Sequence, residues 1–121
     1  MNNKKRGTEF EQEFCQLLAD NGFWVHFMVP NAAGGQPFDV IAVKNGIAYA
    51  VDCKTCKANF FSMSRLEDNQ ILAFEKWMKC GNKVPIIAIK HNDEIRFANY
   101  AKLAAVGTLK ICDLPPIEVL L

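Results

Sequence analysis

Two aspartates and a lysine are the residues of this sequence whose types and spacing could support catalysis. Asp39 is followed, after twelve residues, by Asp52-Cys53-Lys54. Because side chains on a strand alternate between its two faces, Asp52 and Lys54 would point the same way. Asn45-Gly46 is typical of a two-residue hairpin turn, and counting outward from it sets Asp39 opposite Asp52. Directly opposed residues have Cβ atoms within about 5.5 Å of each other, so the two carboxylates are predicted to converge.

The chemistry of such a group depends on how its negative charges are compensated. Two close carboxylates repel each other unless a proton or a cation lies between them, and hard oxygen ligands suit Mg²⁺ or Mn²⁺. A bound metal would polarise a phosphoryl oxygen and lower the pKa of a coordinated water. Lys54 could orient or deprotonate that water, or neutralise charge that develops on a phosphate. The group predicts phosphodiester hydrolysis; the alternative is that Asp39 caps a loop while Asp52 and Lys54 form a solvated strand edge.

Two predicted helices contribute further polar candidates. Residues 8–21 have apolar positions at helical spacing, and Glu11 and Glu13 lie at opposite rims of that apolar face. Periodicity alone does not choose between the two glutamates. In a second predicted helix, residues 64–79, Gln70 falls within the apolar stripe. A glutamine on a buried face needs a polar partner, which would be either core backbone or the same active site.

The order of the predicted elements indicates an α/β fold. The sequence predicts a helix over residues 8–21, strands over 23–29, 39–43 and 47–54, a helix over 64–79, and strands over 84–90 and 94–100. A capping-box pattern at residues 64–67 opens the second helix, residues 30–37 are predicted as a loop, and no element is predicted after residue 100. We expect a single domain, residues 1–121, with a central mixed β-sheet flanked by α-helices.

Composition limits the class of protein. The 121 residues have the size of one domain, and 50% hydrophobic with 22% charged residues exclude a disordered chain. No apolar run approaches the roughly 18 residues of a membrane span, and no signal-peptide pattern follows the basic N-terminus. We therefore expect a cytoplasmic protein. The net charge of +1 excludes a non-specific nucleic-acid coat but not a nuclease, whose metal-binding carboxylates offset its basic residues.

The five cysteines are odd in number and irregularly spaced, so reduced thiols are expected rather than a disulfide framework. Cys53 and Cys56 form a lone CxxC pattern. If this segment stays extended, the two thiols face opposite ways and cannot chelate one zinc ion. A thioredoxin-like role is also disfavoured, because the pattern ends a strand and opens no helix.

Several segments, in their order along the chain, resemble the PD-(D/E)xK nuclease superfamily, and most closely the archaeal-type Holliday junction resolvases. The resemblance covers about the first 60 residues. It rests on Gly7-Thr8-Glu9-Phe10-Glu11-Gln12-Glu13, Leu17-Leu18, Gly22-Phe23, Phe38-Asp39-Val40-Ile41-Ala42 and Val51-Asp52-Cys53-Lys54. It implies a restriction-endonuclease-like fold and a Mg²⁺-dependent, structure-selective endodeoxyribonuclease that resolves four-way DNA junctions, with Mn²⁺ as a possible substitute.

The resemblance also implies roles for individual residues. It makes Glu11, Asp39 and Asp52 the catalytic, metal-binding carboxylates, with the Cys53 carbonyl as a further metal ligand, and it makes Lys54 the catalytic lysine. It favours Glu11 over Glu13. Gln70 resembles a helix glutamine present in some branches of the superfamily and is expected to be a further catalytic residue.

Two positions depart from the pattern. Phe38 stands where the superfamily name expects proline, and Asp52 stands where resolvases usually have glutamate. The shorter side chain withdraws the carboxylate by about 1.5 Å, which could change the metal preference but keeps the ligand.

The sequence also contains candidates for contact with DNA. Lys4, Lys5 and Arg6 precede the first predicted helix, and Lys57 and Arg65 flank a stretch, residues 58–64, predicted to be flexible. These cations would bind phosphates without sequence preference, or serve only as solubilising charge. Phe60 and Phe61, in the same stretch, could pack in the core, pack across a dimer interface or wedge against bases.

The resemblance further implies a homodimer, because a four-way junction presents two symmetric cleavage points. The alternatives are a small flap or restriction-like nuclease of the same superfamily, or a nucleic-acid-binding module on this fold without hydrolysis. The host could be a bacterium, an archaeon or a phage-infected cell.

Overall fold

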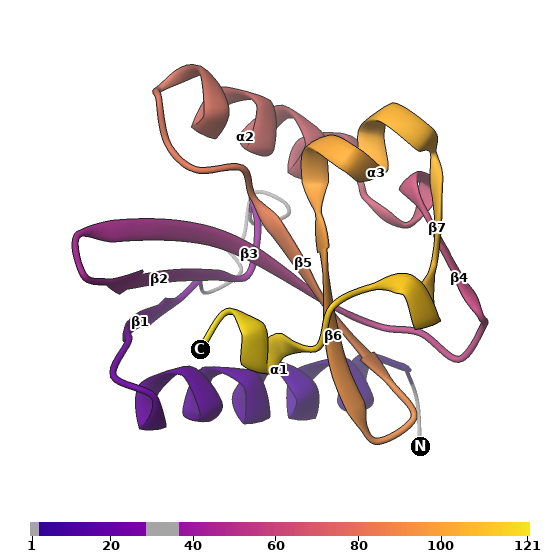
Figure 1. The fold of residues 1–121 in the computed structure, drawn as a ribbon, viewed down its shortest axis with the longest axis horizontal. Helices are drawn as coiled ribbons and strands as arrows, with labels where there is room; N and C mark the ends of the chain where they lie inside the picture. The colour runs from indigo at the N-terminus through magenta and orange to yellow at the C-terminus, as the bar shows by residue number, and fades with distance from the viewer. Residues whose placement is uncertain (1–2, 29–36) are drawn as a thin grey trace.

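The computed structural model describes residues 3–28 and 37–121, with side chains in the first range described from residue 7 onward (Figure 1). The helices are α1 (Asn3–Asp20), α2 (Asp68–Lys79) and α3 (Tyr100–Val106). The strands are β1 (Trp24–Phe27), β2 (Val40–Lys44), β3 (Ile47–Thr55), β4 (Phe60–Ser62), β5 (Ile86–His91), β6 (Glu94–Asn99) and β7 (Thr108–Lys110). Three 3₁₀ turns add η1 (Met63–Arg65), η2 (Ile111–Asp113) and η3 (Ile117–Val119). The loop predicted over residues 30–37 lies, except for Pro37, outside the described residues.

A five-stranded mixed sheet forms the centre of the fold, in the order β1-β2-β3-β5-β6. Neighbours pair antiparallel except for β3 and β5, which are parallel. A parallel pair requires a crossover connection, and here the crossover contains α2. β5 begins with four buried residues, as expected for a strand covered on both faces. The predicted architecture, a mixed sheet flanked by helices, is confirmed.

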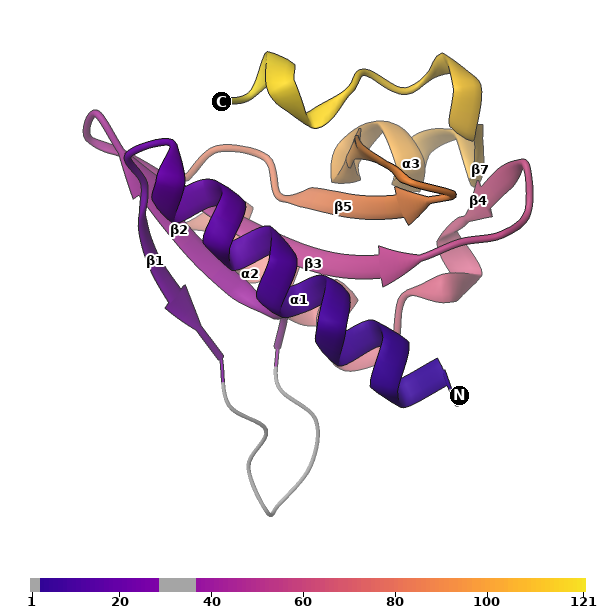
Figure 2. The ribbon, with the colours of Figure 1, turned by 90° about the horizontal axis from the view of Figure 1, so that it is seen from below.

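Helices cover both faces of this sheet. In Figure 2 the sheet is seen from the side of α1, with α2 behind it. The α1 side packs around Phe10, Phe14 and Leu18, and the opposite side packs around Phe74 of α2 and Leu103 of α3. No helix in the described ranges is long and apolar enough to cross a membrane.

The β2–β3 hairpin has the register that the sequence predicts. Lys44 pairs with Ile47, and the intervening Asn45 and Gly46 have φ values of 54° and 78°. Such a two-residue turn needs positive φ at both positions, which asparagine and glycine tolerate best. Lys44 Nζ then donates to Asn21 O at 2.7 Å, which fixes the hairpin to the end of α1.

The structure corrects the predicted start of both long helices. α1 begins at Asn3, five residues earlier than predicted, because lysine and arginine favour helix and the lone Gly7 is tolerated. Lys4, Lys5 and Arg6 therefore belong to the helix rather than precede it. α2 begins after Glu67, whose capping box is closed by Gln70. Ser64 lies instead in η1, where its main-chain nitrogen donates to the Ser62 hydroxyl at 3.2 Å.

The prediction that residues 58–64 form a flexible stretch is also wrong. It contains β4, which pairs antiparallel with β7 in a separate two-stranded sheet. The last strand of the central sheet, β6, ends at Asn99, one residue before the predicted end at residue 100. It ends there because the Asn99 side chain caps α3 by accepting a hydrogen bond from Lys102 N at 3.0 Å. Residues after 100 thus add α3, β7 and two 3₁₀ turns that the sequence did not predict.

Candidate active site

The candidate site lies where β2 and β3 begin to separate. Val40 pairs with Val51, and Asp39, directly before β2, donates its main-chain nitrogen to Val51 O at 3.1 Å, so the strand pairing itself does not extend to the predicted Asp39–Asp52 alignment. The two side chains nevertheless interact. Asp39 is buried, and its Oδ2 accepts from the main-chain nitrogen of Cys53 at 2.8 Å. Asp52 is fully buried. The hairpin therefore brings both carboxylates together.

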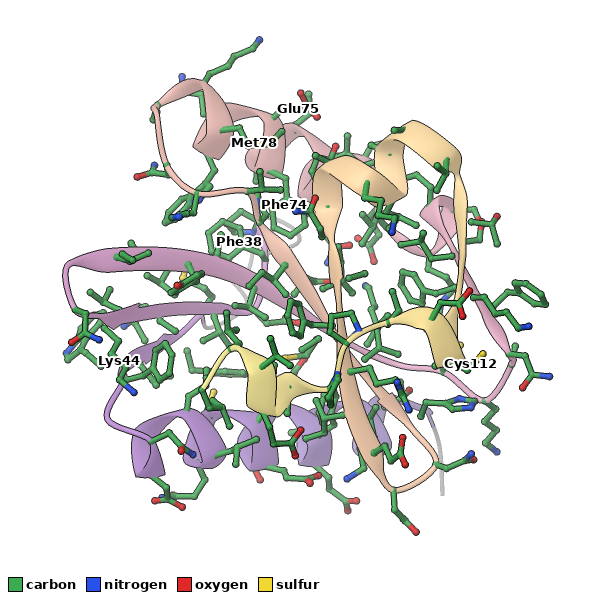
Figure 3. The ribbon with its side chains drawn as sticks, viewed as in Figure 1. Phe38, Lys44, Phe74, Glu75, Met78 and Cys112 are labelled. Atoms are coloured by element: carbon green, nitrogen blue, oxygen red, sulfur yellow. The ribbon has the colours of Figure 1, made fainter. Side chains whose placement is uncertain are left out.

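Asp39 is held in place by its neighbour in the chain. Phe38 is buried, and its ring stacks on Phe74 of α2 with centroids 5.8 Å apart. Trp77 meets the same ring edge-on at 5.9 Å. Figure 3 shows Phe38 and Phe74 pointing toward each other across the sheet-to-helix layer. The packed Phe38 ring thus anchors the adjacent aspartate.

Lys54 and Gln70 complete a polar network around Asp52. Lys54 Nζ lies 3.1 Å from Asp52 Oδ2. Gln70 Nε2 donates to Asp52 Oδ1 at 3.0 Å, while Gln70 Oε1 accepts from Lys54 Nζ at 3.3 Å and from the Glu67 nitrogen at 3.0 Å. The glutamine side chain therefore joins the aspartate, the lysine and the first turn of α2. The amide therefore bonds both the active-site side chains and main chain, so both interpretations of its burial hold.

The structure separates the two helix glutamates that periodicity left open. Glu11 is half-buried and interacts with Asp39, both through its charge and through a side-chain hydrogen bond. Glu13 is exposed and forms an ion pair with Lys90, with Nζ to Oε2 at 2.8 Å. Glu11 therefore joins the aspartates, and Glu13 does not.

The crowding of these acids changes their protonation. Burial, followed by the charge of Asp39, raises the pKa of Glu11 to about 7. Burial and Asp39 also raise the pKa of Asp52, although the Lys54 ammonium opposes this shift. Raised pKa values of this kind follow when carboxylates share a site without enough positive charge.

These residues fit a hard divalent cation. Asp52 Oδ2 is buried, and no group in the described ranges donates a hydrogen bond to it, although the Lys54 ammonium lies nearby. Carboxylate oxygens are the ligands that Mg²⁺ and Mn²⁺ prefer. Across the described part of the chain, no three His, Cys, Asp or Glu side chains are already close enough to form a complete metal cluster. The donor set is suitable, while Lys54 supplies the positive charge nearest to Asp52.

Cys53 contributes to the site only through its main chain. Its thiol belongs to the core on the α1 side of the sheet, whereas Cys56 belongs to the core on the α2 side. The two thiols therefore face opposite ways, as predicted. Burial raises the pKa of the Cys53 thiol well above its usual value, which makes this thiol a poor nucleophile and metal ligand.

A groove of about 900 Å³ lies beside the site, between the first half of α1 and the ends of β3 and β5. Both predicted DNA-binding residues of this region, Lys57 and Arg65, line it. Glu9, Glu13 and Lys90 line it too, and the Lys90 ammonium is paired with Glu13. The sequence analysis did not single out Lys90. There was little reason in the sequence to place Lys90 here, because it is a single cation at the end of an apolar run. It reaches the groove through the parallel pairing of Thr55 with Lys90. The side chains of Lys4, Lys5 and Arg6 lie outside the described part of the structure.

The mixed sheet, the paired acids and the adjacent lysine define a nuclease of the PD-(D/E)xK type. The family model described as archaeal Holliday junction resolvase (Hjc) matches residues 2–113, so the chain belongs to that family. As a member, it is a structure-selective endonuclease that resolves DNA junctions.

A solved structure supports the same fold. The chain is similar to Hjc of Archaeoglobus fulgidus, a Holliday junction resolvase from an archaeal hyperthermophile, with a TM-score of 0.70 and 16% identity. The similarity covers 90% of this chain and 93% of that one. The fold is therefore the restriction-endonuclease-like fold that the resemblance implied. No curated protein sequence matches the chain.

Proposed function

We propose that this nuclease cuts four-way DNA junctions with a Mg²⁺ ion held by Glu11, Asp39, Asp52 and the main-chain carbonyl of Cys53. Lys54 is the catalytic lysine of this proposal. The observation that carries it is the 3.1 Å contact between Lys54 Nζ and buried Asp52, directly beside Asp39. Asp39, directly before β2, and Asp52 on β3 lie beside a lysine on the same strand face as Asp52, a combination that suits phosphodiester hydrolysis.

When bound, the divalent ion supplies a Lewis acid and lowers the pKa of a coordinated water. The protein groups supply the rest. Lys54 is only partly exposed, with 17% of its side chain accessible, so its positive charge acts where water screens it weakly. That charge can stabilise the negative charge that develops on the phosphate oxygens in the transition state.

Gln70 acts in this proposal as a positioning residue rather than as a catalytic one. Its amide nitrogen and oxygen bond Asp52 and Lys54 at the same time. One planar amide therefore fixes the distance between the acid and the lysine. The capping bond to Glu67 N in turn fixes the amide to the start of α2.

Lys57 and Arg65 are proposed to bind DNA phosphates along the groove, with Lys4, Lys5 and Arg6 extending this surface. Support for the groove residues comes from their place beside the site. Arg65 has a structural task as well, since its Nη2 donates to Thr55 O at 2.9 Å. Lys57 is thus the simpler residue for testing phosphate binding.

We further propose a homodimer, because two symmetric cuts across a junction need two active sites. A cytoplasmic location in a bacterial, archaeal or phage-infected cell likewise remains a prediction. Light scattering of the protein alone, and with a junction present, measures the first of these. A monomer that stays monomeric on the junction would contradict the dimer.

The direct experiment offers the protein a synthetic four-way junction, a flap and a linear duplex, each with and without Mg²⁺. Symmetric incision of the junction alone, and only with Mg²⁺, is the expected result. Cutting of flaps or duplex would favour a nuclease of different selectivity, and tight binding without cutting would favour a non-catalytic module. Lys54→Ala serves as the control for contaminating nucleases.

A further inference from the structure

The two-stranded ribbon formed by β4 and β7 presents an aromatic ring to solvent. Side chains alternate along β4, so that Phe61 is fully buried while Phe60 is 55% exposed. Phe60 pairs directly with Lys110 of β7, which is also exposed. One face of the ribbon therefore packs into the core, and the other offers a phenylalanine beside a lysine.

The ribbon is held firmly at its base. Ile111 N donates to Asn59 O at 2.8 Å, and Met63 N donates to Gly107 O at 2.8 Å, one bond beyond each end of the pairing. On the inner face, the Arg65 guanidinium lies 5.3 Å from the centre of the Phe61 ring. Phe60 is thus carried on a fixed support, which lowers the entropic cost of using it for binding.

The charge of this region is one-sided. Residues 55–66 contain Lys57 and Arg65 and no acid, and residues 99–112 contain Lys102 and Lys110 and no acid. The whole chain has a net charge of only +1. Acids begin directly beyond both segments, at Glu67, Asp68 and Asp113. Lys57 and Lys110, both exposed, are the cations nearest to Phe60 in the sequence and in the strand pairing, and they suit contact with phosphate.

The ribbon also lies close to the active site. Figures 1 and 2 both show β4 following the far end of β3, at the same end of the molecule as the start of α1. Phe60 is six residues beyond Lys54, so their Cα atoms are at most about 20 Å apart. This reach corresponds to roughly six nucleotides at 3.4 Å per step.

We propose that the β4–β7 ribbon binds the branch point of the junction, with Phe60 stacked on a base exposed there and with Lys57 and Lys110 on the flanking phosphates. This inference rests on the proposed function and names the feature of the substrate that the ribbon reads. In a linear duplex every base is stacked on both sides, whereas the exchange point of four arms interrupts stacking. An aromatic ring gains most from such an uncovered base, and it does so without sequence preference.

The test measures junction and duplex affinities in Ca²⁺, a metal chosen to allow binding without cutting, for the wild type, Phe60→Ala and Phe60→Trp. Loss of one base–aromatic stack should weaken junction binding by roughly 5- to 100-fold for Phe60→Ala. Duplex affinity should stay within about twofold, and Phe60→Trp should restore junction affinity. Val119→Ala, another exposed apolar residue, is the matched control and should change neither affinity.

Salt dependence separates the ring from the cations. Phe60→Ala should leave the slope of log affinity against log salt unchanged, while Lys110→Ala should reduce that slope by about one. A Phe60→Ala variant that keeps wild-type junction preference would overturn the stacking proposal and leave the nuclease proposal intact. A wild-type protein without any preference for the junction over duplex would overturn both.

Discussion

Lys54 Nζ lies 3.1 Å from Asp52 Oδ2, and the two side chains share one strand face beside Asp39. Asp52 is completely buried, and the Lys54 ammonium opposes the rise in its pKa that burial and Asp39 cause, so Lys54 favours the ionised form that a metal would need. A buried acid that loses its counter-charge is costly. The same pair therefore links the stability of the β2–β3 hairpin to the chemistry proposed for it.

Substitution of Asp39 or Lys54 should slow catalysis strongly without preventing DNA binding. Asp39→Asn keeps the size of the side chain and Lys54→Ala removes the ammonium, and each should slow junction cutting by roughly a hundredfold or more. Single-turnover cleavage gives the rate, and circular dichroism checks the fold. Wild-type rates in either variant would remove that residue from the mechanism.

The two helix glutamates provide a matched pair of variants. Glu11→Gln removes an acid that contacts Asp39 and should slow cutting strongly. Glu13→Gln removes only an ion pair with Lys90 at the surface, worth less than about 1 kcal/mol. Its cutting rate should stay within a few-fold of wild type. Equal effects of the two substitutions would contradict the assignment of Glu11 to the site.

Substitution of Gln70 should slow cutting by more than the accompanying loss of folding stability can explain. Gln70→Ala leaves Asp52 Oδ1 without its donor, which should cost about 1–3 kcal/mol of stability and slow cutting by roughly tenfold or more through misplacement of Lys54. Glu67→Ala, which disturbs only the helix cap, should cost about 1 kcal/mol with a nearly normal rate. Junction affinity should not change in either variant. A Gln70→Ala rate equal to that of Glu67→Ala would leave the glutamine as a cap alone.

The acids also predict how the stability of the metal-free protein depends on pH. Glu11, with a pKa of about 7, and Asp52, with a raised pKa, hold protons in the folded state that the unfolded chain has already lost above about pH 5. The folded state binds more protons, so the stabilising contribution of these groups falls as pH rises from about 5 to about 8.

Thermal unfolding in EDTA measures this effect. The Tm should fall between pH 5.5 and pH 8, and Asp39→Asn should reduce the fall, because the charge of Asp39 raises both pKa values. Mn²⁺ or Mg²⁺ should raise the wild-type Tm more at pH 8 than at pH 5.5, where protons compete with the metal. An equally steep fall in Asp39→Asn would show that other groups cause it.

Local signals were sufficient to predict the part of the site built on one hairpin. Asn45-Gly46 determines the turn, the turn determines the register from Lys44–Ile47 to Val40–Val51, and this register brings Asp39 and Asp52 to the same end of the hairpin. Gln70 was predictable as a buried polar residue, but its two partners were not, since they depend on how α2 packs on the sheet. Glu11 was separated from Glu13 by the resemblance and by the structure, because both glutamates lie at a rim of the same helix face.

The missed features depend on pairings between distant residues. β4 and β7 are three-residue strands, and Phe60 pairs with Lys110, fifty positions away in the sequence. Strands this short have no detectable periodicity, and their register is set by packing of Phe61 and Leu109 into the core. Lys90 was missed for a related reason. Parallel pairing of β3 with β5 places Lys90 beside Thr55, but the crossover that contains α2 separates these two residues in the sequence.

The most direct measurement of the central claim is an anomalous-scattering map from crystals of the protein soaked in Mn²⁺. The account predicts one strong peak between the carboxylates of Asp39 and Asp52, absent from matched crystals of Asp39→Asn. A map without density between these side chains in crystals of the active enzyme, or a peak bound elsewhere on the chain, would contradict it.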